Sequence, residues 1–545
     1  MPIPTPQAEL QRISAALQLA ERDDDVPAQI RLYRQLLKIT PDLAIAHAAL
    51  AKVLLQSGDE AAAIPHVEFA LAQPQDEKID KCLFGALSTC KHFTGQLERA
   101  REWFEATPNL YRFLLLYEAL QETGAKTEIE RLLQWMLSQE RPAIQQSKLL
   151  TLLGQQYYAD GRFHDCIGCY QLSLQLAPGS IPEMNNLALA MEQVGNYKDA
   201  MDIYQQVLKL DPAHAGAHNN IGLLLLRHGH FEKGWEEFEW RWQATQGEHF
   251  QHFNIPRWQG EPLEGKSLIV WAEQGIGDHI MFASMLNELS QLCTNLHYEI
   301  YARLDPLFRR SFPSVRFIRR EQHGEEQLGD QPVFKQTWPQ ADYQIAVGSL
   351  PSLLRRSREA FPIQRQYLWA DTEATTRLRA EYHSRFPGKR LIGVSWRGGR
   401  DIGNESQSRR IPLTQLGRLS KLPNVQLINL QYGDVVDEME EATRNGVDIF
   451  NDTRVNPLAN MDNQATQISA LDAVVSIDNT TVHLAGALGV PTYALLPLNP
   501  NFRWGLEEGP SYWYPSVHLI RNREIGRWET ALDRAVAAMR DNGHL

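Results

Sequence analysis

The chain has 545 residues, of which 43% are hydrophobic and 22% are charged, as in a globular protein of several domains. The formal net charge of −12 argues against broad binding to nucleic acid or to anionic membranes.

Five cysteines, odd in number and unevenly placed, do not make a disulfide framework and favour a reducing compartment. The opening MPIPTPQAEL has neither the basic nor the apolar region of a signal peptide. No apolar run approaches the roughly 18 residues that a membrane-spanning helix needs. We therefore expect a cytoplasmic protein with no membrane span and no nucleic-acid partner.

Prolines recur in the first part of the chain at intervals of 33 to 36 residues, at Pro41, Pro74, Pro108, Pro142, Pro178 and Pro212. A period of about 34 residues is typical of helix-turn-helix repeats. Small residues such as Ala188 and aromatic residues such as Tyr204 recur where the two helices of a repeat must meet, and each proline stops a second helix. The pattern resembles the tetratricopeptide repeat (TPR), and we assign residues 1–245 to an array of about six repeats.

Arrays of this kind present a concave face to a partner. Asn185, Asn186, Asn219 and Asn220 fall on the first helices of the last repeats, which usually line that face in TPR proteins. We expect their amides to hold the extended backbone of a protein acceptor. The alternative is that they are solvated polar residues on an array that only supports the second half. Cys166 and Cys169 form a CxxC, but Cys166 takes a small-residue position, so we expect packed thiols.

The end of the array and a connector over residues 246–265 are rich in tryptophan, including Trp235, Trp240, Trp242 and Trp258. Such a concentration predicts a buried joint between the two halves. The alternative is a platform on which a sugar stacks.

After Lys266, apolar strands alternate with helices, which is typical of parallel α/β sheets. A break near Phe386–Lys389 divides the strands into two Rossmann-like domains, 266–385 and 386–545, facing each other across a cleft. We expect the final helix, near residues 528–539, to pack back onto the first of them. The predicted fold class is therefore α + α/β, an N-terminal TPR α-solenoid followed by two Rossmann-like domains. The expected strands cover 267–272, 298–302, 343–347, 391–396, 425–431, 474–477 and 492–496.

Residues 474–488, VVSIDNTTVHLAGAL, describe an apolar strand that ends at Asp478 and leads into a helix. The turn carries Asn479, Thr480 and Thr481, and His483 follows on the helix. Free N–H groups and the positive end of the helix dipole suit a phosphate there. The carboxyl edge of a parallel sheet is also where such domains bind nucleotides.

The first Rossmann-like domain opens with a strand followed by Gly275, Ile276, Gly277 and Asp278. Ile280 stands where a dinucleotide fingerprint has glycine, so the two glycines alone are weak evidence. Asp278 is either a helix N-cap or a general base facing the cleft.

Across the cleft, arginines flank a glycine-rich turn. We expect Arg397 and Arg409 to bind a diphosphate through bidentate contacts. Arg400 and Arg410 are expected to be surface residues.

Together the GIGD turn, the segment after Arg409 and the Asp478–Gly486 turn resemble the heptosyltransferase-type GT-B glycosyltransferases. With the repeats and the motifs FEWRW, EQGIGD, FRW and YWYP, the chain is similar over nearly its whole length to bacterial TPR–glycosyltransferase fusions, some of which modify flagellin. The architecture is also similar to that of the O-GlcNAc transferases. Two positions depart from the pattern: Asn501 replaces an acidic residue before FRW, and Asn479 replaces the commoner threonine.

The resemblance implies that Asp278 is the catalytic base and that Arg409 contacts the donor diphosphate. It places the donor also at Asp478, Thr480, Thr481 and His483, beside which we include Asn479, Arg397, Gly275 and Gly277. No D-x-D follows residue 265, so we expect no metal and no cofactor, with arginine, hydroxyls and helix ends stabilising the leaving group.

The resulting hypothesis is an inverting, metal-independent glycosyltransferase. It moves a sugar from a nucleotide sugar to a hydroxyl of a protein acceptor, with flagellin suggested by the resemblance. One alternative is transfer to a glycan or lipopolysaccharide, against which the long array argues. The other is a non-catalytic scaffold that keeps a degenerate GT-B domain, against which Asp278, Arg409 and His483 together argue.

Overall fold

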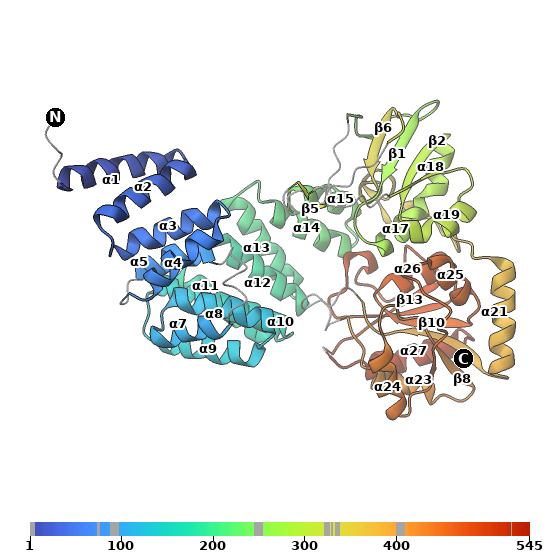
Figure 1. Cartoon of the computed structure of the whole chain (residues 1–545). Helices are drawn as coiled ribbons and strands as arrows, with labels where there is room; N and C mark the ends of the chain where they lie inside the picture. Colours follow the sequence, from blue (N-terminus) through green and yellow to red (C-terminus); the bar gives the residue numbers. More distant parts are fainter. Residues whose placement is uncertain are drawn as a thin grey trace. The chain divides into compact units, whose positions relative to one another are not determined.

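The structure is a computed structural model that describes residues 6–73, 77–87, 97–244, 254–320, 327–328, 331–332, 338–398, 409–524 and 526–545. The chain divides into two compact units, residues 1–156 and 157–545. The division falls inside helix α10 (Ala143–Ala159), within the repeat array (Figure 1). Each unit is described by itself.

Unit 1 consists of helices that pack against their neighbours in sequence, as α1 does against α2 and α3 against α4. Asp25, Asp59 and Asn109 cap helices by accepting a hydrogen bond from the backbone N–H three residues on. Ala48 and Ala51 lie in the core, where small residues let helices approach. The helices are α1 (Pro6–Arg22), α2 (Val26–Ile39), α3 (Ala44–Gln56), α4 (Glu60–Leu71), α5 (Glu77–Leu87), α7 (Leu97–Ala106), α8 (Leu110–Thr123), α9 (Lys126–Ser138) and most of α10.

The repeats around residues 76–140, where the sequence pattern is weakest, are joined by a buried ion pair. Arg112 Nε on α8 lies 3.1 Å from Asp80 Oδ2 on α5, and both side chains are less than 5% exposed. Asn109 also donates to Asp80. A buried polar contact thus joins α5 to α8 in this region.

The last hairpins of the array belong to unit 2. Gly222 on α14 lets α15 approach closely, since a Cβ there would lie 2.7 Å from the backbone nitrogen of Phe238. Cys166 and Cys169 are free and buried, and burial raises the pKa of their thiols to about 12 and about 11, as expected for packed rather than reactive groups. The helices are α11 (Phe163–Leu176), α12 (Ile181–Gln193), α13 (Tyr197–Leu210), α14 (Ala215–Arg227), α15 (Phe231–Phe238) and α16 (Arg241–Ala244).

The periodic prolines lie just beyond the second helices of hairpins: Pro41, Pro108, Pro142, Pro178 and Pro212 follow α2, α7, α9, α11 and α13. Pro74 lies outside the described residues. A further hairpin, α14 with α15, follows the last of these prolines and leads into the α/β half.

The first α/β sheet has the strand order β3-β2-β1-β6 and is parallel throughout. Its central strand β1 (Ser267–Trp271) is almost wholly buried, which explains its continuous apolar sequence. The other strands are β2 (Asn295–Ile300), β3 (Arg316–Arg319) and β6 (Tyr343–Ala346), and the helices are α17 (Ile276–Phe282), α18 (Leu286–Leu292), α19 (Asp305–Ser311) and α20 (Pro351–Leu354). A separate short hairpin joins β4 (Gln327–Leu328) to β5 (Gln331–Pro332).

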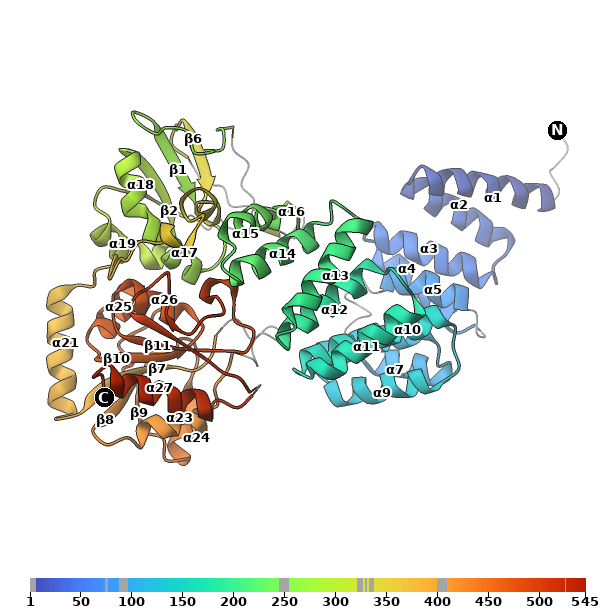
Figure 2. The same cartoon turned by 180° about the vertical axis from the view of Figure 1, so that it is seen from behind.

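The second sheet has the order β12-β13-β11-β10-β7-β8-β9 and is parallel except for the edge strand β12. Helices α21 and α25 pack together on one side of this second α/β domain, as Figure 2 shows from behind. Its strands are β7 (Arg390–Ser395), β8 (Val425–Asn429), β9 (Ile449–Phe450), β10 (Ala473–Ile477), β11 (Thr492–Leu496), β12 (Gly509–Pro510) and β13 (Val517–Arg521). Its helices are α21 (Thr372–Arg385), α23 (Leu413–Ser420), α24 (Val436–Arg444), α25 (Met461–Ser469), α26 (Thr480–Ala487) and α27 (Glu529–Asp541).

The final helix corrects one prediction. Instead of packing back onto the first domain, α27 packs on α23, β11 and β13 of its own domain. Leu532 and Val536 of α27 join the same core as Leu416 of α23 and Tyr493 of β11. An amphipathic helix after a parallel strand simply covers the nearest sheet face.

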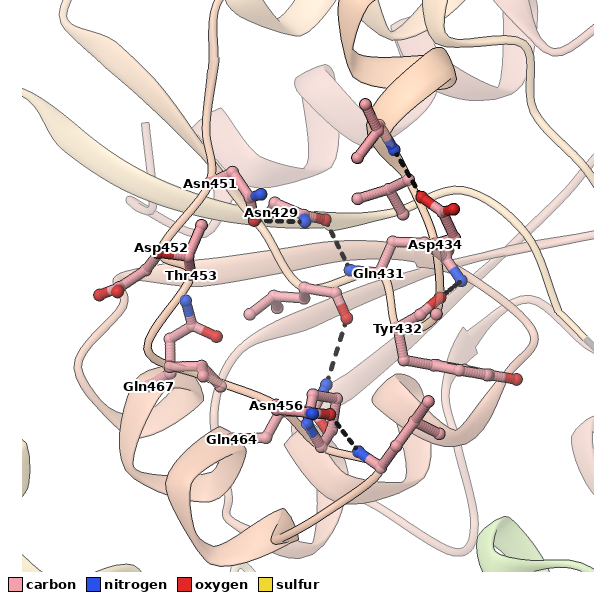
Figure 3. Close-up of a pocket in the computed structure, with 17 residues that line it drawn as sticks. Asn429, Gln431, Tyr432, Asp434, Asn451, Asp452, Thr453, Asn456, Gln464 and Gln467 are labelled. Atoms are coloured by element: carbon pink, nitrogen blue, oxygen red, sulfur yellow. Dashed lines mark hydrogen bonds between the residues drawn. The ribbon is translucent and has the colours of Figure 1, made fainter.

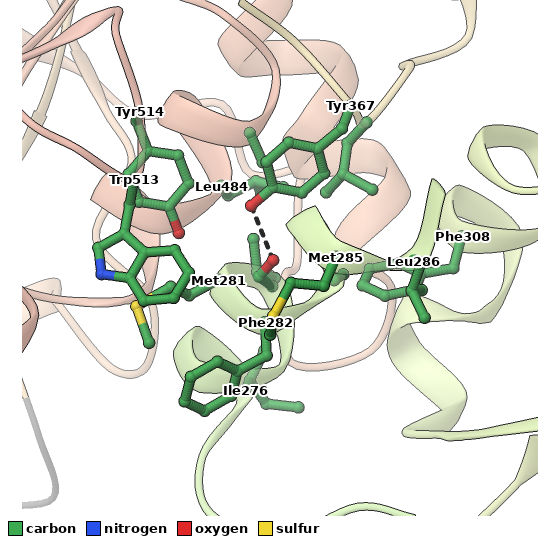
Figure 4. Close-up of a cluster of buried hydrophobic side chains, with 14 of the residues drawn as sticks. Ile276, Met281, Phe282, Met285, Leu286, Phe308, Tyr367, Leu484, Trp513 and Tyr514 are labelled. Atoms are coloured by element: carbon green, nitrogen blue, oxygen red, sulfur yellow. Dashed lines mark hydrogen bonds between the residues drawn. The ribbon is translucent and has the colours of Figure 1, made fainter. Parts of the chain in front are cut away.

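The two α/β domains and the last repeats share one hydrophobic core. It runs from Phe231 and Trp235 on α15 through α17 to Leu484 on α26. Figure 4 shows Tyr367, whose hydroxyl donates to the carbonyl of Ile280 at 2.8 Å, inside this cluster. The aromatic residues at the end of the array are thus mostly core.

A buried ion pair fixes the end of the array to the first sheet. Arg241 on α16 donates from Nε and Nη2 to the carboxylate of Glu273, at 3.0 and 2.7 Å, and from Nη2 to Ser349 Oγ at 2.7 Å. The nitrogen of Gly348 donates to the same carboxylate at 2.8 Å. Glu273 follows β1 and Ser349 follows β6, so the crevice where this sheet's strand order reverses is filled from the array.

Replacement Arg241→Ala is expected to lower the free energy of unfolding of unit 2 by about 3–5 kcal/mol, because it leaves the Glu273 carboxylate buried without its partner. Thermal unfolding of the whole chain, followed by circular dichroism, measures the effect. The matched control is Arg418→Ala, which breaks an exposed pair with Asp533 and should change stability by about 1 kcal/mol or less. Equal shifts for both variants would contradict the structural role of Arg241.

Candidate functional site

The carboxyl ends of β7 and β10 meet where the strand order of the second sheet reverses, a usual place for a ligand. Asn479 ties the two ends together. Its Nδ2 donates to Ser395 Oγ at 2.7 Å and to the carbonyl of Arg397 at 3.0 Å, and its Oδ1 accepts from Thr481 N at 3.0 Å. Asn479 therefore caps α26 and joins the two strand ends, and its amide group is taken up by hydrogen bonds within the protein.

Arg409 binds the strand end at Asp478. Its Nε donates to the backbone carbonyl of Asp478 at 3.1 Å, and its Nη2 lies 3.7 Å from the carboxylate Oδ2. Gly398 leaves room for this contact, since a Cβ there would lie 2.8 Å from the Asp478 carbonyl. Burial opposes ionisation of Asp478, but the charges of Arg409 and Arg503 outweigh it, so the pKa of the carboxyl is lowered.

The first turn of α26 has the features of an anion site. Thr480 is partly exposed, whereas Thr481 is 1% exposed and its hydroxyl has no hydrogen-bond partner among the described residues. A buried hydroxyl without a partner is costly, and the helix N-terminus beside it favours negative charge.

Arg397 lies at the end of β7 but faces away from the α26 turn. Its Nε donates to Glu438 Oε2 at 3.0 Å and its Nη2 to the carbonyl of Asp434 at 2.7 Å. Arg410 donates to the same Glu438 at 2.6 Å. Arg397 is thus held at the rim of a neighbouring pocket, while Arg400 lies outside the described residues.

The first domain reaches this crevice through α17, which packs directly on α26 (Figures 1 and 2). Gly277 permits the contact, since a Cβ there would lie 2.9 Å from His483 Cδ2. Gly275 is the N-cap of α17, and a Cβ there would meet Asp278 Oδ2 only at an ordinary 3.6 Å. Gly277, and not Gly275, therefore serves the close approach of the two helices.

Asp278 lies in the first turn of α17 and is 8% exposed. Its Oδ1 accepts a hydrogen bond from Arg503 Nε at 2.5 Å and also contacts Nη2 of the same guanidinium. Among the described residues, Oδ2 accepts no hydrogen bond, so one carboxylate oxygen stays available for a proton. Arg503 comes from the second domain, in a 3₁₀ turn at Phe502–Trp504.

His483 lies between these groups as a neutral imidazole. Its Nδ1 forms a 2.8 Å hydrogen bond with the hydroxyl of Tyr514, and its ring stacks on Trp504 with centroids 4.9 Å apart. Burial and the nearby charge of Arg503 lower the pKa of His483 to about 4. The structure thus brings Asp278, Arg409, Asp478, Thr481 and His483 to one place.

A polar pocket of about 410 Å³ opens at the ends of β8 and β9 (Figure 3). Asn429 Nδ2 donates to Asn451 Oδ1 at 2.9 Å, and Gln464 Nε2 donates to the carbonyl of Leu430 at 3.1 Å. Gln431, also in its lining, accepts from the backbone nitrogen of Arg397 at 3.0 Å and so joins the pocket to the crevice.

A second pocket, of about 190 Å³, lies between the last repeats and the crevice. The array contributes Gln193, Asn220 and Arg227, and the second α/β domain contributes polar residues of a loop after β11. Asn220 Nδ2 donates to Asn185 Oδ1 at 3.1 Å, so these two amides stand side by side on adjacent first helices. Asn186 and Asn219 are partly exposed on the same helices, outside this pocket. The pocket also contains Arg409, Asp478, Asn499 and Asn501.

Sequence reasoning missed Arg503 and the polar residues of the larger pocket. The FRW motif carries Arg503, but its partner Asp278 is 225 residues away along the chain. The polar run after β8, from Gln431 to Asp434, was the available signal for the pocket.

Two absences hold for the described part of the chain. Its helices include none with the length and apolarity that crossing a membrane requires. Nor do its His, Cys, Asp and Glu side chains gather in threes where a metal ion could bind.

Comparison with known proteins agrees with the repeats seen in the structure. A family model described as TPR repeat matches residues 193–229. Protein FlbA of Caulobacter vibrioides is 32% identical over 316 residues, which are 57% of this chain and 52% of the relative. The chain therefore spans about half the length of the curated relative it matches.

Solved structures match each half. The glycosyl transferase family 9 protein from Veillonella parvula aligns with 52% of this chain and 91% of its own, at 12% identity and a TM-score of 0.34. The ADP-heptose lps heptosyltransferase II of E. coli aligns with 51% and 99%, at 14% identity and a TM-score of 0.36. YrrB, a TPR protein with an unusual peptide-binding site, aligns with 34% and 95%, at 13% identity and a TM-score of 0.26.

The strand order and helix pairing of the chain itself define α-helical repeats, matched in part by the TPR model, followed by two Rossmann-like domains, and the predicted fold class is confirmed.

The neutral state of His483 makes stability depend on pH. Its pKa in the folded chain, about 4, is below the unfolded value near 6.5, so the unfolded state gains protons first as the pH falls. Between pH 7 and pH 5 this group alone should remove about 2 kcal/mol of stability. In His483→Gln the loss over the same range should be smaller by that amount. Thermal unfolding at both pH values measures it, and identical pH profiles would contradict a neutral buried His483.

Proposed function

We propose that the chain is an inverting, metal-independent glycosyltransferase that moves a sugar from a nucleotide sugar to a hydroxyl of a protein acceptor. The observation that carries the proposal is the meeting of two domains at one crevice. The carboxylate of Asp278 from the first domain lies against Arg503, beside the anion-binding start of α26 from the second.

The donor is proposed to span the crevice. Its nucleoside takes the polar pocket at the ends of β8 and β9, whose volume and amide lining suit a base and a ribose. Its diphosphate lies at the start of α26, where the helix N-terminus and the partly exposed Thr480 meet it and Arg409 supplies positive charge. Arg397, held by Glu438, is assigned to the rim of the nucleoside pocket.

Asp278 is proposed as the general base. The acceptor oxygen attacks the anomeric carbon while its proton passes to Asp278 Oδ2. The bond from that carbon to the diphosphate oxygen breaks, and the electron pair leaves with the nucleoside diphosphate. The helix end and Arg409 stabilise the charge that develops there, and a single displacement inverts the anomeric centre.

The acceptor is proposed to enter through the smaller pocket, where the array meets the crevice. Amides from both halves line it, among them Gln193, Asn220, Asn499 and Asn501. Amide side chains pair with peptide N–H and C=O groups whatever the sequence, which favours an extended protein segment. Flagellin is the acceptor that the resemblance to TPR–glycosyltransferase fusions suggests. The cysteines within the described ranges, Cys82, Cys166, Cys169 and Cys293, are free, which supports the proposal of a cytoplasmic location.

A donor panel tests the proposal. UDP-N-acetylglucosamine, GDP-mannose, ADP-glucose, dTDP-rhamnose and a CMP-sugar are compared by thermal shift of the whole chain, since a ligand that binds the folded state raises the melting temperature. The bound donor is then used for transfer, and NMR of the product gives the anomeric configuration. Retention would refute a single displacement, and binding of no donor would favour the scaffold. Transfer to a glycan but to no protein would favour the lipopolysaccharide alternative.

Replacement Asp278→Asn should keep the donor-induced thermal shift but lower kcat by about 10²–10⁴-fold, the usual contribution of a general base. The matched control is Asp462→Asn, which alters another Asp–Arg pair between the two domains, with Arg310, away from the crevice. The control should keep kcat within about twofold. An Asp278→Asn chain with wild-type kcat excludes the proposed base.

Replacement Asn220→Ala should raise KM for a protein acceptor several-fold, because it removes an amide from the pocket lining and from the Asn185 pair. Initial rates at varied acceptor concentration measure it. Lys198→Ala, a substitution of an exposed residue on α13, is the control. Unchanged acceptor KM would show that the acceptor does not use this pocket.

A further inference from the structure

The loop that carries Arg503 is held by the array. Arg227 on α14 donates from Nε to the carbonyl of Pro500 at 2.9 Å. Phe502 packs between Trp235 and Phe238 of α15, with ring centroids 5.9 and 5.5 Å away. The segment Pro497–Gly505 therefore belongs to the second domain by sequence but is positioned by the last repeats.

The far end of the same loop reaches the crevice. Arg503 binds the carboxylate of Asp278, and Trp504 stacks on His483. A shift of the loop would move both contacts, because only two residues separate the Pro500 carbonyl from Arg503.

Arg227 is itself fixed by a buried network. Its Nη1 donates to Glu192 Oε2 at 2.5 Å, and Tyr204 donates to Glu192 Oε1 at 2.7 Å. The side chains of Arg227 and Glu192 are 8% and 5% exposed. A buried ion pair contributes little net stability compared with apolar packing, but it fixes geometry sharply. Here the pair with Glu192 orients the Arg227 guanidinium toward the Pro500 carbonyl of the second α/β domain.

We infer that Arg227 of the repeat array is a positioning residue for the transfer reaction. By holding the Pro500 carbonyl it sets Arg503, and through Arg503 it sets the carboxylate of Asp278. The inference rests on the proposed function, and it makes the last repeats part of the catalytic machinery as well as a place for the acceptor.

Arg227 also lines the acceptor pocket, so an acceptor-binding role must be separated from a positioning role. Hydrolysis of the donor makes the distinction. Water then replaces the acceptor hydroxyl, its proton still passes to Asp278, and free sugar and nucleoside diphosphate are released. An acceptor-binding residue has no part in that reaction, whereas a positioning residue for Asp278 does.

The experiment uses the full chain and whichever nucleotide sugar of the panel gives the largest thermal shift, with water or glycerol as acceptor and release of nucleoside diphosphate as readout. Arg227→Lys should lower kcat at least tenfold while donor KM stays within twofold. Arg503→Lys should do the same, and the double variant should be no worse than either one, because both act on Asp278. Arg162→Lys, which alters an exposed pair with Asp165, is the matched control and should match wild type.

Hydrogen exchange supplies a readout that needs no activity. Arg227→Lys should speed exchange in residues 497–505 and in the first turn of α17, and Arg162→Lys should not. If Arg227→Lys does not fold, Glu192→Gln, which keeps the shape of the pair, is measured instead and should show the same changes to a smaller degree.

Wild-type donor hydrolysis in Arg227→Lys, multiplicative losses in the double variant, or unchanged exchange over residues 497–505 would each overturn the inference. Wild-type chain that binds no donor would instead overturn the proposed function, and exchange would still report on the loop.

Discussion

The ion pair between Asp278 and Arg503 is the contact on which the site depends. It joins α17 of the first α/β domain to a turn of the second, and it places a carboxylate beside the start of α26. Gly277 lets α17 and α26 approach closely at His483, next to this pair. A crevice between two domains thus becomes a site with fixed geometry, since each side of it supplies a charge that the other side needs.

The two sheets use the same topological position in opposite ways. In the first sheet, the crevice between β1 and β6 is filled by Arg241 of the array, which binds Glu273 and Ser349. In the second sheet, the crevice between β7 and β10 is bordered by two pockets. In the first domain, the crevice at the switch in strand order is therefore occupied by a contact that holds the repeats. In the second domain, the equivalent crevice stays open to a ligand.

The sequence predicted those features that are determined by residues close together along the chain. Proline spacing and apolar runs predicted the hairpins and the strands β1, β2, β6, β7, β8, β10 and β11, whereas the strands β3, β9, β12 and β13 were missed. The anion site at the Asp478 turn stays a prediction. Contacts between distant segments were out of reach: the partner of Arg503 lies 225 residues away, and an amphipathic pattern did not say which sheet α27 would cover. Asn479 was expected at the donor, and only the structure reveals that its amide is used to join β7 to β10.

Charge balance gives the Asp278–Arg503 pair a further consequence for the proposed reaction. In the free crevice, the carboxylates of Asp278 and Asp478 face the guanidiniums of Arg503 and Arg409. A donor diphosphate adds about two negative charges, and the helix end offsets only about half of one. The surplus negative charge of the diphosphate would therefore fall to Arg409, beside the start of α26, while Asp278 keeps Arg503 as its partner. A loop anchored by Arg227 holds that pairing, so that the proposed base stays in place when the donor binds.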